Sequence, residues 1–245
     1  MDVWFGLIIV IFMLFAAFVQ GSIGFGFPLV TTVLLSLFMN IQTAIFFTLI
    51  PSLYLNVVTI RSEGHFFQAL KAYYMYALLT MIGVGVGMMI LLSYETPVFK
   101  LLLACMIYLY LFFNKLKLNL SFIHTHPHLA MGTFAVGGGV VGGLTNAIGP
   151  IYLIYALESG FDRAKLIQMG NVCFLGMKFV QILLFGFYGK LSQIELGFST
   201  GVLVGVGIMF YLGVKVKEKM PLEMYKKVIR VLLFIIATVL VFKTL

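Results

Sequence analysis

A glycine-rich stretch near the start of the chain decides the fold: Gln20-Gly21-Ser22-Ile23-Gly24-Phe25-Gly26-Phe27-Pro28. It interrupts an apolar run that begins at Val3, and the apolar segment 28–39 follows it. Proline suits the first turn of a helix, because its missing N–H would have no partner inside the helix. Segment 28–39 is shorter than the roughly 20 residues that a full membrane span needs. The stretch therefore predicts a broken helical hairpin, in which one helix ends and a short returning helix begins.

A second break of the same kind follows in the other half of the chain: Gly142-Gly143-Leu144-Thr145-Asn146-Ala147-Ile148-Gly149-Pro150. Pro150 lies 122 positions after Pro28, and a short apolar segment, 150–158, again follows the proline. Other landmarks repeat at nearly the same offset: Gly83 with Gly205, Gly85 with Gly207, and Pro97 with Pro221. Because these matches are collinear, they predict an internal duplication of roughly 1–114 and 128–245.

Composition restricts the class of protein. Hydrophobic residues make up 62% of the 245 residues and charged residues 10%, and the mean hydropathy is +1.12. A soluble domain is about 45–50% apolar and about 25% charged. These values exclude a cytosolic enzyme, a nucleic-acid-binding domain and a disordered chain. The apolar runs lack the alternation of a membrane β-barrel, so a polytopic helical membrane protein is predicted.

The apolar segments give the fold in detail: an all-α membrane protein of two repeats, each a broken hairpin followed by three transmembrane helices. The first repeat, 1–114, has its hairpin at 3–39 and helices at 41–60, 68–93 and 98–114. A cytoplasmic linker is predicted at 115–127. The second repeat, 128–245, has its hairpin at 129–158 and helices at 164–188, 194–214 and 224–243.

The distribution of basic residues predicts the topology. If each broken hairpin returns to its starting side, one side of the membrane holds 12 Lys and Arg, and the other holds Lys100, Lys190 and Lys243. If each crosses once, the distribution is 9 against 6. Cytoplasmic loops carry an excess of Lys and Arg, so the hairpin arrangement is favoured. It places both termini on the outer side of the cytoplasmic membrane. The second repeat then starts from the opposite side to the first, so the repeats are inverted. No basic region precedes Val3, so 3–20 is interpreted as a retained helix.

The two breaks are the predicted binding site. A helix that starts inside the bilayer presents unpaired N–H groups and a partial positive charge, and broken helices in inverted repeats are typical of transporter sites. Two such helix starts could converge on an anion. The candidate residues at the breaks are Gln20, Ser22, Gly24, Gly26, Thr145 and Asn146. In the alternative interpretation, the glycines only permit close packing of helices.

Two polar stripes on apolar helices complete the candidate site. Asn171, Lys178 and Gln181 share one face of helix 164–188. The corresponding helix of the first half carries Thr48, Ser52, Asn56 and Thr59 on one face. Lys178 lies about 22 Å along the helix from Arg163, past the middle of the bilayer. It could face an anionic substrate or snorkel to the outer interface, and Asn171 and Gln181 could instead join helices to one another.

The remaining titratable residues predict little chemistry inside the membrane. All eight acidic residues lie in loops or at helix ends, so a carboxylate proton relay is disfavoured. His124, His126 and His128 lie at the linker with no Cys or carboxylate beside them, and we predict no metal, no cofactor and no enzyme activity. The net charge of +8 reflects basic loops, so no nucleic-acid partner is expected. The expected partners are a small anion, the lipid bilayer and a second copy of the chain in a homodimer.

On the stretches Gly21–Pro28 and Gly142–Pro150, the chain resembles the sulfite exporter TauE/SafE family of membrane transport proteins. The resemblance covers essentially the whole chain. It implies passive or ion-coupled movement, in the direction of export, of small organosulfur anions such as sulfite, sulfoacetate or related sulfonates. The alternative from another class is a non-transporting membrane subunit or scaffold of a larger complex, which would show no substrate-dependent flux.

Overall fold

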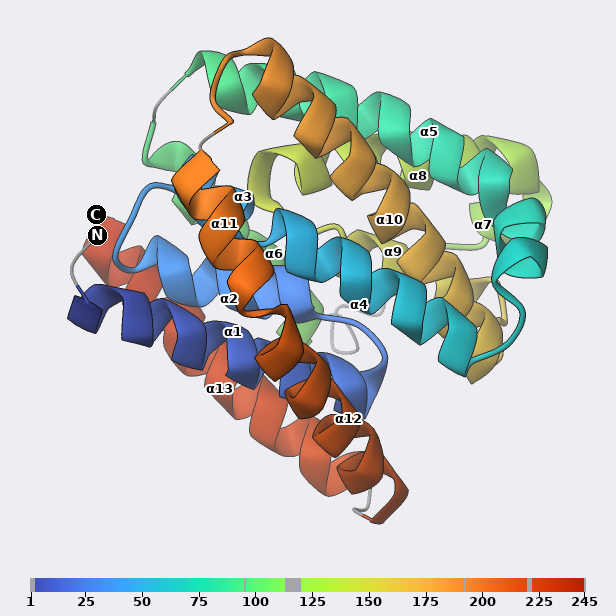
Figure 1. The fold of residues 1–245 in the computed structure, drawn as a ribbon. Helices are drawn as coiled ribbons and strands as arrows, with labels where there is room; N and C mark the ends of the chain where they lie inside the picture. The colour runs from blue at the N-terminus through green and yellow to red at the C-terminus, as the bar shows by residue number, and fades with distance from the viewer. Residues whose placement is uncertain (1–2, 95, 113–119, 192, 220–221, 245) are drawn as a thin grey trace.

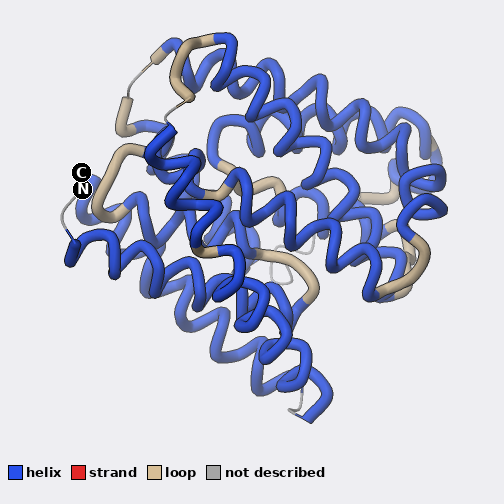
Figure 2. Tube along the Cα trace, viewed as in Figure 1, coloured by secondary structure: helices blue, strands red, loops and turns tan. Residues whose placement is uncertain are grey.

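The computed structural model describes residues 3–94, 96–112, 120–191, 193–219 and 222–244. Every regular element within them is a helix (Figure 2), so the all-α prediction is confirmed. The first half contains α1 (Val3–Ile23), α2 (Phe27–Ser36), α3 (Ile41–Phe47), α4 (Leu49–Ser62), α5 (Phe66–Ser93) and α6 (Val98–Phe112). The second half contains α7 (Phe122–Thr125), α8 (Pro127–Thr145), α9 (Gly149–Glu158), α10 (Arg163–Phe187), α11 (Gln193–Gly201), α12 (Leu203–Lys219) and α13 (Leu222–Thr244).

Two predicted helices differ from the structure because each is bent. The segment predicted as one helix over 41–60 is divided into α3 and α4, which meet at 47°. Pro51 explains this bend, since it has no N–H to donate to the carbonyl of Phe47 four residues earlier. The hydroxyl of Ser199, on α11, donates to that carbonyl instead, at 3.3 Å. The segment predicted over 194–214 is likewise divided into α11 and α12, at 44°.

The predicted linker 115–127 also differs in part. Residues 115–119 lie outside the described residues, as do residues 113 and 114 of the predicted helix 98–114. Beyond them the chain forms the short helix α7 and then enters α8 at Pro127. Proline again takes the first turn of the helix, so the linker ends one residue earlier than predicted.

Glycines bring two pairs of helices into backbone contact, and each pair joins one half of the chain to the other. A Cβ placed on Gly21 of α1 would lie 2.0 Å from the Phe210 carbonyl oxygen of α12. In the same way, a Cβ on Gly83 of α5 would lie 2.1 Å from the Val136 oxygen of α8. No side chain fits at either crossing, so α1 with α12 and α5 with α8 form two closely packed units.

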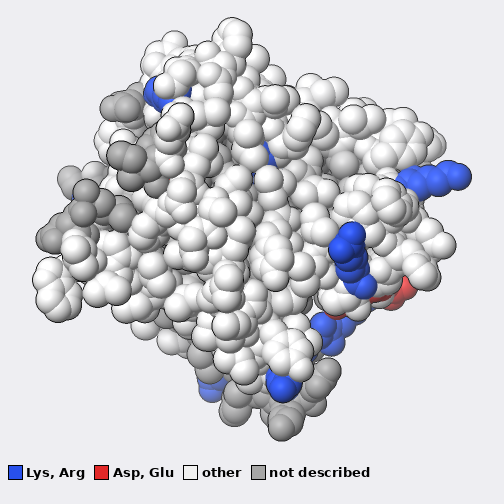
Figure 3. Space-filling model, viewed as in Figure 1, with Lys and Arg blue, Asp and Glu red and all other residues white. Residues whose placement is uncertain are grey.

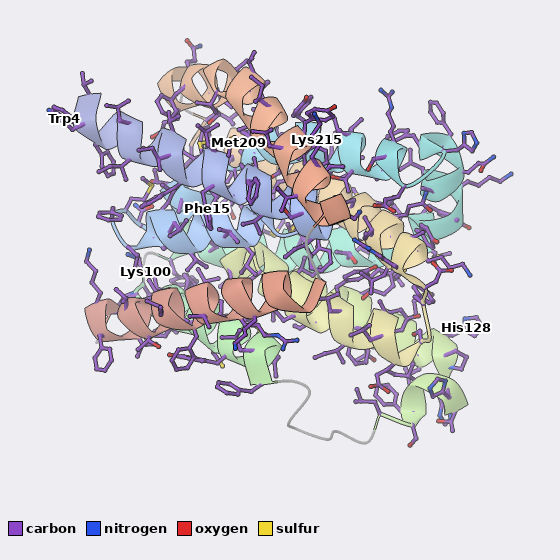
Figure 4. All side chains as sticks on the ribbon, turned by 90° about the horizontal axis from the view of Figure 1, so that it is seen from below. Trp4, Phe15, Lys100, His128, Met209 and Lys215 are labelled. Atoms are coloured by element: carbon purple, nitrogen blue, oxygen red, sulfur yellow. The ribbon has the colours of Figure 1, made fainter. Side chains whose placement is uncertain are left out.

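Two further pairs of helices pack against each other. Helix α4 packs against α10, and α6 packs against α13. Figure 1 shows α1, α12 and α13 on one side of the molecule and α5 and α8 on the other, with α4 between them. The two ends of the chain lie at the same end of the bundle (Figure 1). Trp4 and Lys100 lie toward that end and His128 toward the opposite one (Figure 4).

The surface and the helix lengths fit a bilayer. The face in Figure 3 is almost free of charged side chains, and blue Lys and Arg atoms collect mainly at its margins. Three helices, α1, α5 and α10, are long and apolar enough to cross a membrane, and up to five spans result if each bent pair counts as one. Large apolar side chains are exposed on these helices, including Leu7, Ile82 and Leu183. The chain is therefore a multi-pass membrane protein.

Candidate functional site: two helix breaks on one helix pair

The first break is closed by a network of neutral amides. Helix α1 ends at Ile23, and Gly24 and Gly26 both take positive φ, at 98° and 119°. The Gln20 side chain accepts a hydrogen bond from the Phe27 N–H at 3.0 Å, and so ties the start of α2 back to α1. Its amide nitrogen lies 3.4 Å from the Asn171 oxygen and 3.3 Å from the Thr59 hydroxyl. Gln20 thus supplies the N-terminal acceptor that a capping side chain would give.

Asn171 completes this network from α10. Its amide nitrogen donates to the carbonyl oxygens of Gly24 and Ile167, each at 2.8 Å. A Cβ on Gly24 would lie 2.7 Å from the Ile167 side chain and would have to be accommodated at a positive φ, so a side chain here would require Ile167 to shift. Gln20, Thr59 and Asn171 are buried, and the first break therefore contains polar groups but no charge.

The second break is built around an asparagine. Asn146 caps the end of α8 in the left-handed region, with φ at 62°, a conformation that Asn tolerates better than most residues. Its amide nitrogen donates to the hydroxyls of Thr32 at 2.7 Å and Thr48 at 3.0 Å. The Pro28 carbonyl lies 3.5 Å from the same nitrogen. A carbonyl can only accept, so this contact fixes which end of the amide is nitrogen.

Lys178 binds the other end of that amide. Its ammonium nitrogen lies 2.7 Å from the Asn146 oxygen, 2.7 Å from the Gln181 oxygen and 2.9 Å from the Thr48 hydroxyl. The Thr48 hydroxyl donates its own hydrogen to the Ile45 carbonyl, so it accepts from Lys178. The three donors of an ammonium group thus meet three neutral oxygens.

The position of Lys178 argues against the interpretation that this residue snorkels to an interface. Its side chain is 0% exposed and its nitrogen points at the second break, so it does not snorkel to an interface. Among the described residues, the ion pairs are Lys165 with Asp162 and Lys217 with Glu63, and Lys178 belongs to neither. A buried charge without a counter-charge is costly. An anion that came to this place would supply the missing charge.

A small cavity lies where the two breaks approach each other. Its volume is about 40 Å³, and it is lined by Gly26 and Pro28 from the first break and by Asn146, Gly149 and Pro150 from the second. Phe25, Phe174 and Met177 form apolar walls. The N-cap residues of α2 and α9 make no side-chain cap hydrogen bond. Gln20 nevertheless accepts from the first N–H of α2. Residues at the starts of both helices line this cavity, and the partial positive charge of a helix start suits an anion.

Eight of the predicted site residues fall into three groups. Gln20, Gly24 and Asn171 meet at the first break, Thr48, Asn146, Lys178 and Gln181 meet at the second, and Gly26 lines the cavity between them. Thr145 lies at the second break, but its hydroxyl donates to the Val141 carbonyl of its own helix and accepts from the Ala147 N–H. Ser22 is not brought to either cluster, because its hydroxyl donates to the Phe18 carbonyl of its own helix at 2.8 Å. Ser52 and Asn56 lie on α4 between Thr48 and Thr59.

Ser52 and Asn56 are unusual because their polar atoms have no hydrogen-bond partner. Both residues are buried, and the Ser52 oxygen and both polar atoms of Asn56 are unpaired. Buried polar groups are normally paired. These two residues follow the face of α4 that carries Thr48 to the second break and Thr59 to the first. The four residues form a polar stripe about 16 Å long that connects the breaks.

Sequence reasoning missed Thr32, which accepts from Asn146. The signal was present in the paired hydroxyls of Thr31 and Thr32 in an otherwise apolar returning helix. Thr59 was recognised in the polar stripe but not placed among the site residues, although it binds Gln20.

Comparison with known proteins gives one match. No similar curated protein and no similar solved structure was found. A family model described as sulfite exporter TauE/SafE matches residues 9–240. That range contains both breaks, the polar stripe of α4 and Lys178. Since the match spans nearly the whole chain, this membrane protein belongs to the sulfite exporter TauE/SafE family.

Proposed function

We propose that this chain exports small sulfur oxyanions, sulfite, sulfoacetate or related sulfonates, through the cavity between the two breaks. The observation that carries the proposal is Lys178: a fully buried ammonium group that contacts only neutral oxygens. The substrate anion is its counter-charge. Asn146, which stands between Lys178 and the cavity, holds the lysine while no anion is bound.

Electrostatics favours an outward direction. A negative charge that crosses a membrane with a negative interior gains about 2.3 kcal/mol per 100 mV on leaving. Such a carrier does not need a proton relay. The two helix starts and Lys178 supply positive potential in a low-dielectric region. The attraction of each for an anion is stronger there than in water.

Helix pairing supports the proposed inverted repeats. Under the offset of 122 residues, α1 corresponds to α8 and α12 to α5, so the pair α1–α12 and the pair α8–α5 are counterparts. The pairs α4–α10 and α6–α13 each join one element to its own counterpart. A two-fold relation between the halves produces this set of pairs.

The bends support alternation between two states. Helices α3 and α4 are bent against each other, but their counterpart α10 is one uninterrupted helix, and α11 and α12 are bent whereas α5 is uninterrupted. Two repeats of one design thus have different shapes. We infer that they exchange these shapes when the site opens to the other side, as transporters with inverted repeats do.

The proposed orientation has both termini outside, in the cytoplasmic membrane. The three lysines of the sparse side bind carbonyls near one end of the bundle: Lys100 that of Ser36, Lys190 that of Leu92 and Lys243 that of Leu37. That end also holds both chain ends (Figure 1). A reporter fused to either terminus should therefore lie outside, and a cytoplasmic reporter would overturn the orientation. A homodimer stays a prediction without an assigned interface.

The test is flux in proteoliposomes with an imposed potential, with sulfite, thiosulfate, sulfoacetate and acetate compared. Wild-type protein should move at least one sulfur oxyanion, and Lys178→Met should abolish that flux while its elution on gel filtration stays unchanged. Lys165→Met is the matched control, because Lys165 lies on the same helix with 61% of its side chain exposed. Flux equal to wild type in Lys178→Met would remove this residue from the site.

A further inference from the structure

A second cavity lies beside the first break. It lies on the side away from the small cavity between the two breaks, which we call the central cavity. Its volume is about 240 Å³, and its lining includes Gly24, Thr59, Ser62, Glu63 and Lys217. We refer to it as the vestibule. It lies where α4 ends, between α1 and α12. Four of its eight lining residues have polar side chains, in contrast with the apolar walls of the central cavity.

The two glycines of the first break line different cavities. Gly24 faces the vestibule and Gly26 faces the central cavity. The three residues from Gly24 to Gly26 therefore form a thin partition between the two spaces. Thr59 belongs both to the vestibule and to the network that holds this partition, through its contact with Gln20. An anion in the vestibule would lie one step from the proposed transport site.

The sizes of the two cavities fit successive stages of dehydration. A buried water needs about 10–15 Å³ of such volume. The central cavity, at about 40 Å³, has room for a few water molecules, whereas the vestibule, at about 240 Å³, has room for an oxyanion together with part of its hydration shell. An anion would keep water in the vestibule and lose it on crossing the partition.

The vestibule already contains a cation that binds an oxyanion. The Lys217 nitrogen lies 3.0 Å from a carboxylate oxygen of Glu63, and the two side chains are 21% and 18% exposed. The carboxylate of Glu63 shows that Lys217 can hold a charged oxygen group inside this cavity. The pair also connects α12, which packs on α1, to the end of α4. Breaking it would free the unit that carries the first break.

We propose that the vestibule is an entry subsite for the transported oxyanion. Lys217 binds the anion there, and Glu63 occupies Lys217 while the subsite is empty. The incoming anion displaces the carboxylate and so separates α12 from the end of α4. This inference rests on the proposed transport function, and it adds a second cation to the path before Lys178.

The experiment compares Glu63→Gln and Lys217→Gln with wild type in the proteoliposome flux assay. Glu63→Gln removes the internal competitor, so the anion concentration that gives half-maximal flux should fall about fivefold; Lys217→Gln removes the binding cation, so that concentration should rise about fivefold. Lys165→Gln is the control matched to Lys217→Gln, since it breaks the exposed pair with Asp162 and lowers the net charge by the same amount. It should leave the half-saturating concentration unchanged.

A labelling assay tests the same subsite without transport. Ser62→Cys is introduced into a Cys105→Ser, Cys173→Ala background, and its reaction with a negatively charged methanethiosulfonate is timed. Adding Glu63→Gln should speed the reaction, and adding Lys217→Gln should slow it. Opposite shifts support the subsite.

Shifts in the same direction, or none, would show that the pair only joins two helices, and would overturn the subsite while transport stands. Wild-type protein that is folded but moves no anion would overturn the proposed function and the entry subsite together.

Discussion

The two helix breaks share a plan but differ in charge. At the first, Gln20 and Asn171 hold the backbone of Gly24 and Phe27 with neutral amides. At the second, Asn146 holds the ammonium group of Lys178. Helix α4 contributes one threonine to each break, and α10 contributes amide side chains to both. The two breaks therefore differ in their chemistry: the first is held by neutral amides, whereas the second surrounds the ammonium group of Lys178.

Placing the same charge at each break gives the largest expected effect. Asn146→Asp would give Lys178 an internal partner, which would compete with the substrate, so flux should be lost while the protein stays folded. Asn171→Asp would bury a carboxylate against the Gly24 and Ile167 carbonyls and should cost about 3–5 kcal/mol of stability. Flux and thermal unfolding of both variants are the measurements. If both variants lost stability to the same degree, the two breaks would not differ in charge as described.

A methyl group placed at each break gives a smaller effect. Gly24→Ala forces a side chain into positive φ and against Ile167, and should cost about 1–2 kcal/mol or more. Gly149→Ala is the control, because no atom lies within 4 Å of the added Cβ. Its unfolding temperature should stay near that of wild type. A comparable loss in both would indicate that the second break is packed as tightly as the first.

The smallest expected effect on stability comes from the polar stripe between the breaks. Asn56→Leu replaces an amide without a hydrogen-bond partner by an apolar side chain of similar size. Such a change is close to neutral or slightly stabilising in a folded protein. The unfolding temperature should therefore stay the same or rise, while flux falls because the path between the breaks loses a polar group. A large loss of stability would show that Asn56 has a structural role, and its place on the path would then be wrong.

The sequence predicted the helices better than the contacts between them. Proline and glycine act within a few residues, so Pro28 and Pro150 correctly marked the starts of two short helices. The same kind of signal was overlooked at Pro51, which bends its helix and leaves the Phe47 carbonyl without a helical partner. The Ser199 hydroxyl, 152 residues after Phe47, donates to that carbonyl. Local patterns report local backbone geometry, and the partner in space is not written beside them.

The candidate site shows the same limit. Periodicity placed Lys178 and Gln181 on one face of α10, and they do contact each other. It did not indicate that Asn146, Thr32 and Thr48 would converge on the same point from three other segments. The pair of Glu63 and Lys217 was missed for this reason too, since its partners are 154 residues apart.

The close crossing of α1 and α12 has a consequence for biogenesis. Gly21 contacts the backbone of Phe210, a residue synthesised about 190 positions later, which at about 5–20 residues per second is a wait of roughly 10–40 s. During that time, α1 must reside in lipid while the backbone surface at Gly21 has no helix packed against it. The nascent chain is therefore incomplete until its second half has been inserted, and a ribosome stalled after α10 would leave in the membrane a half-assembled protein for the cell's quality control to remove.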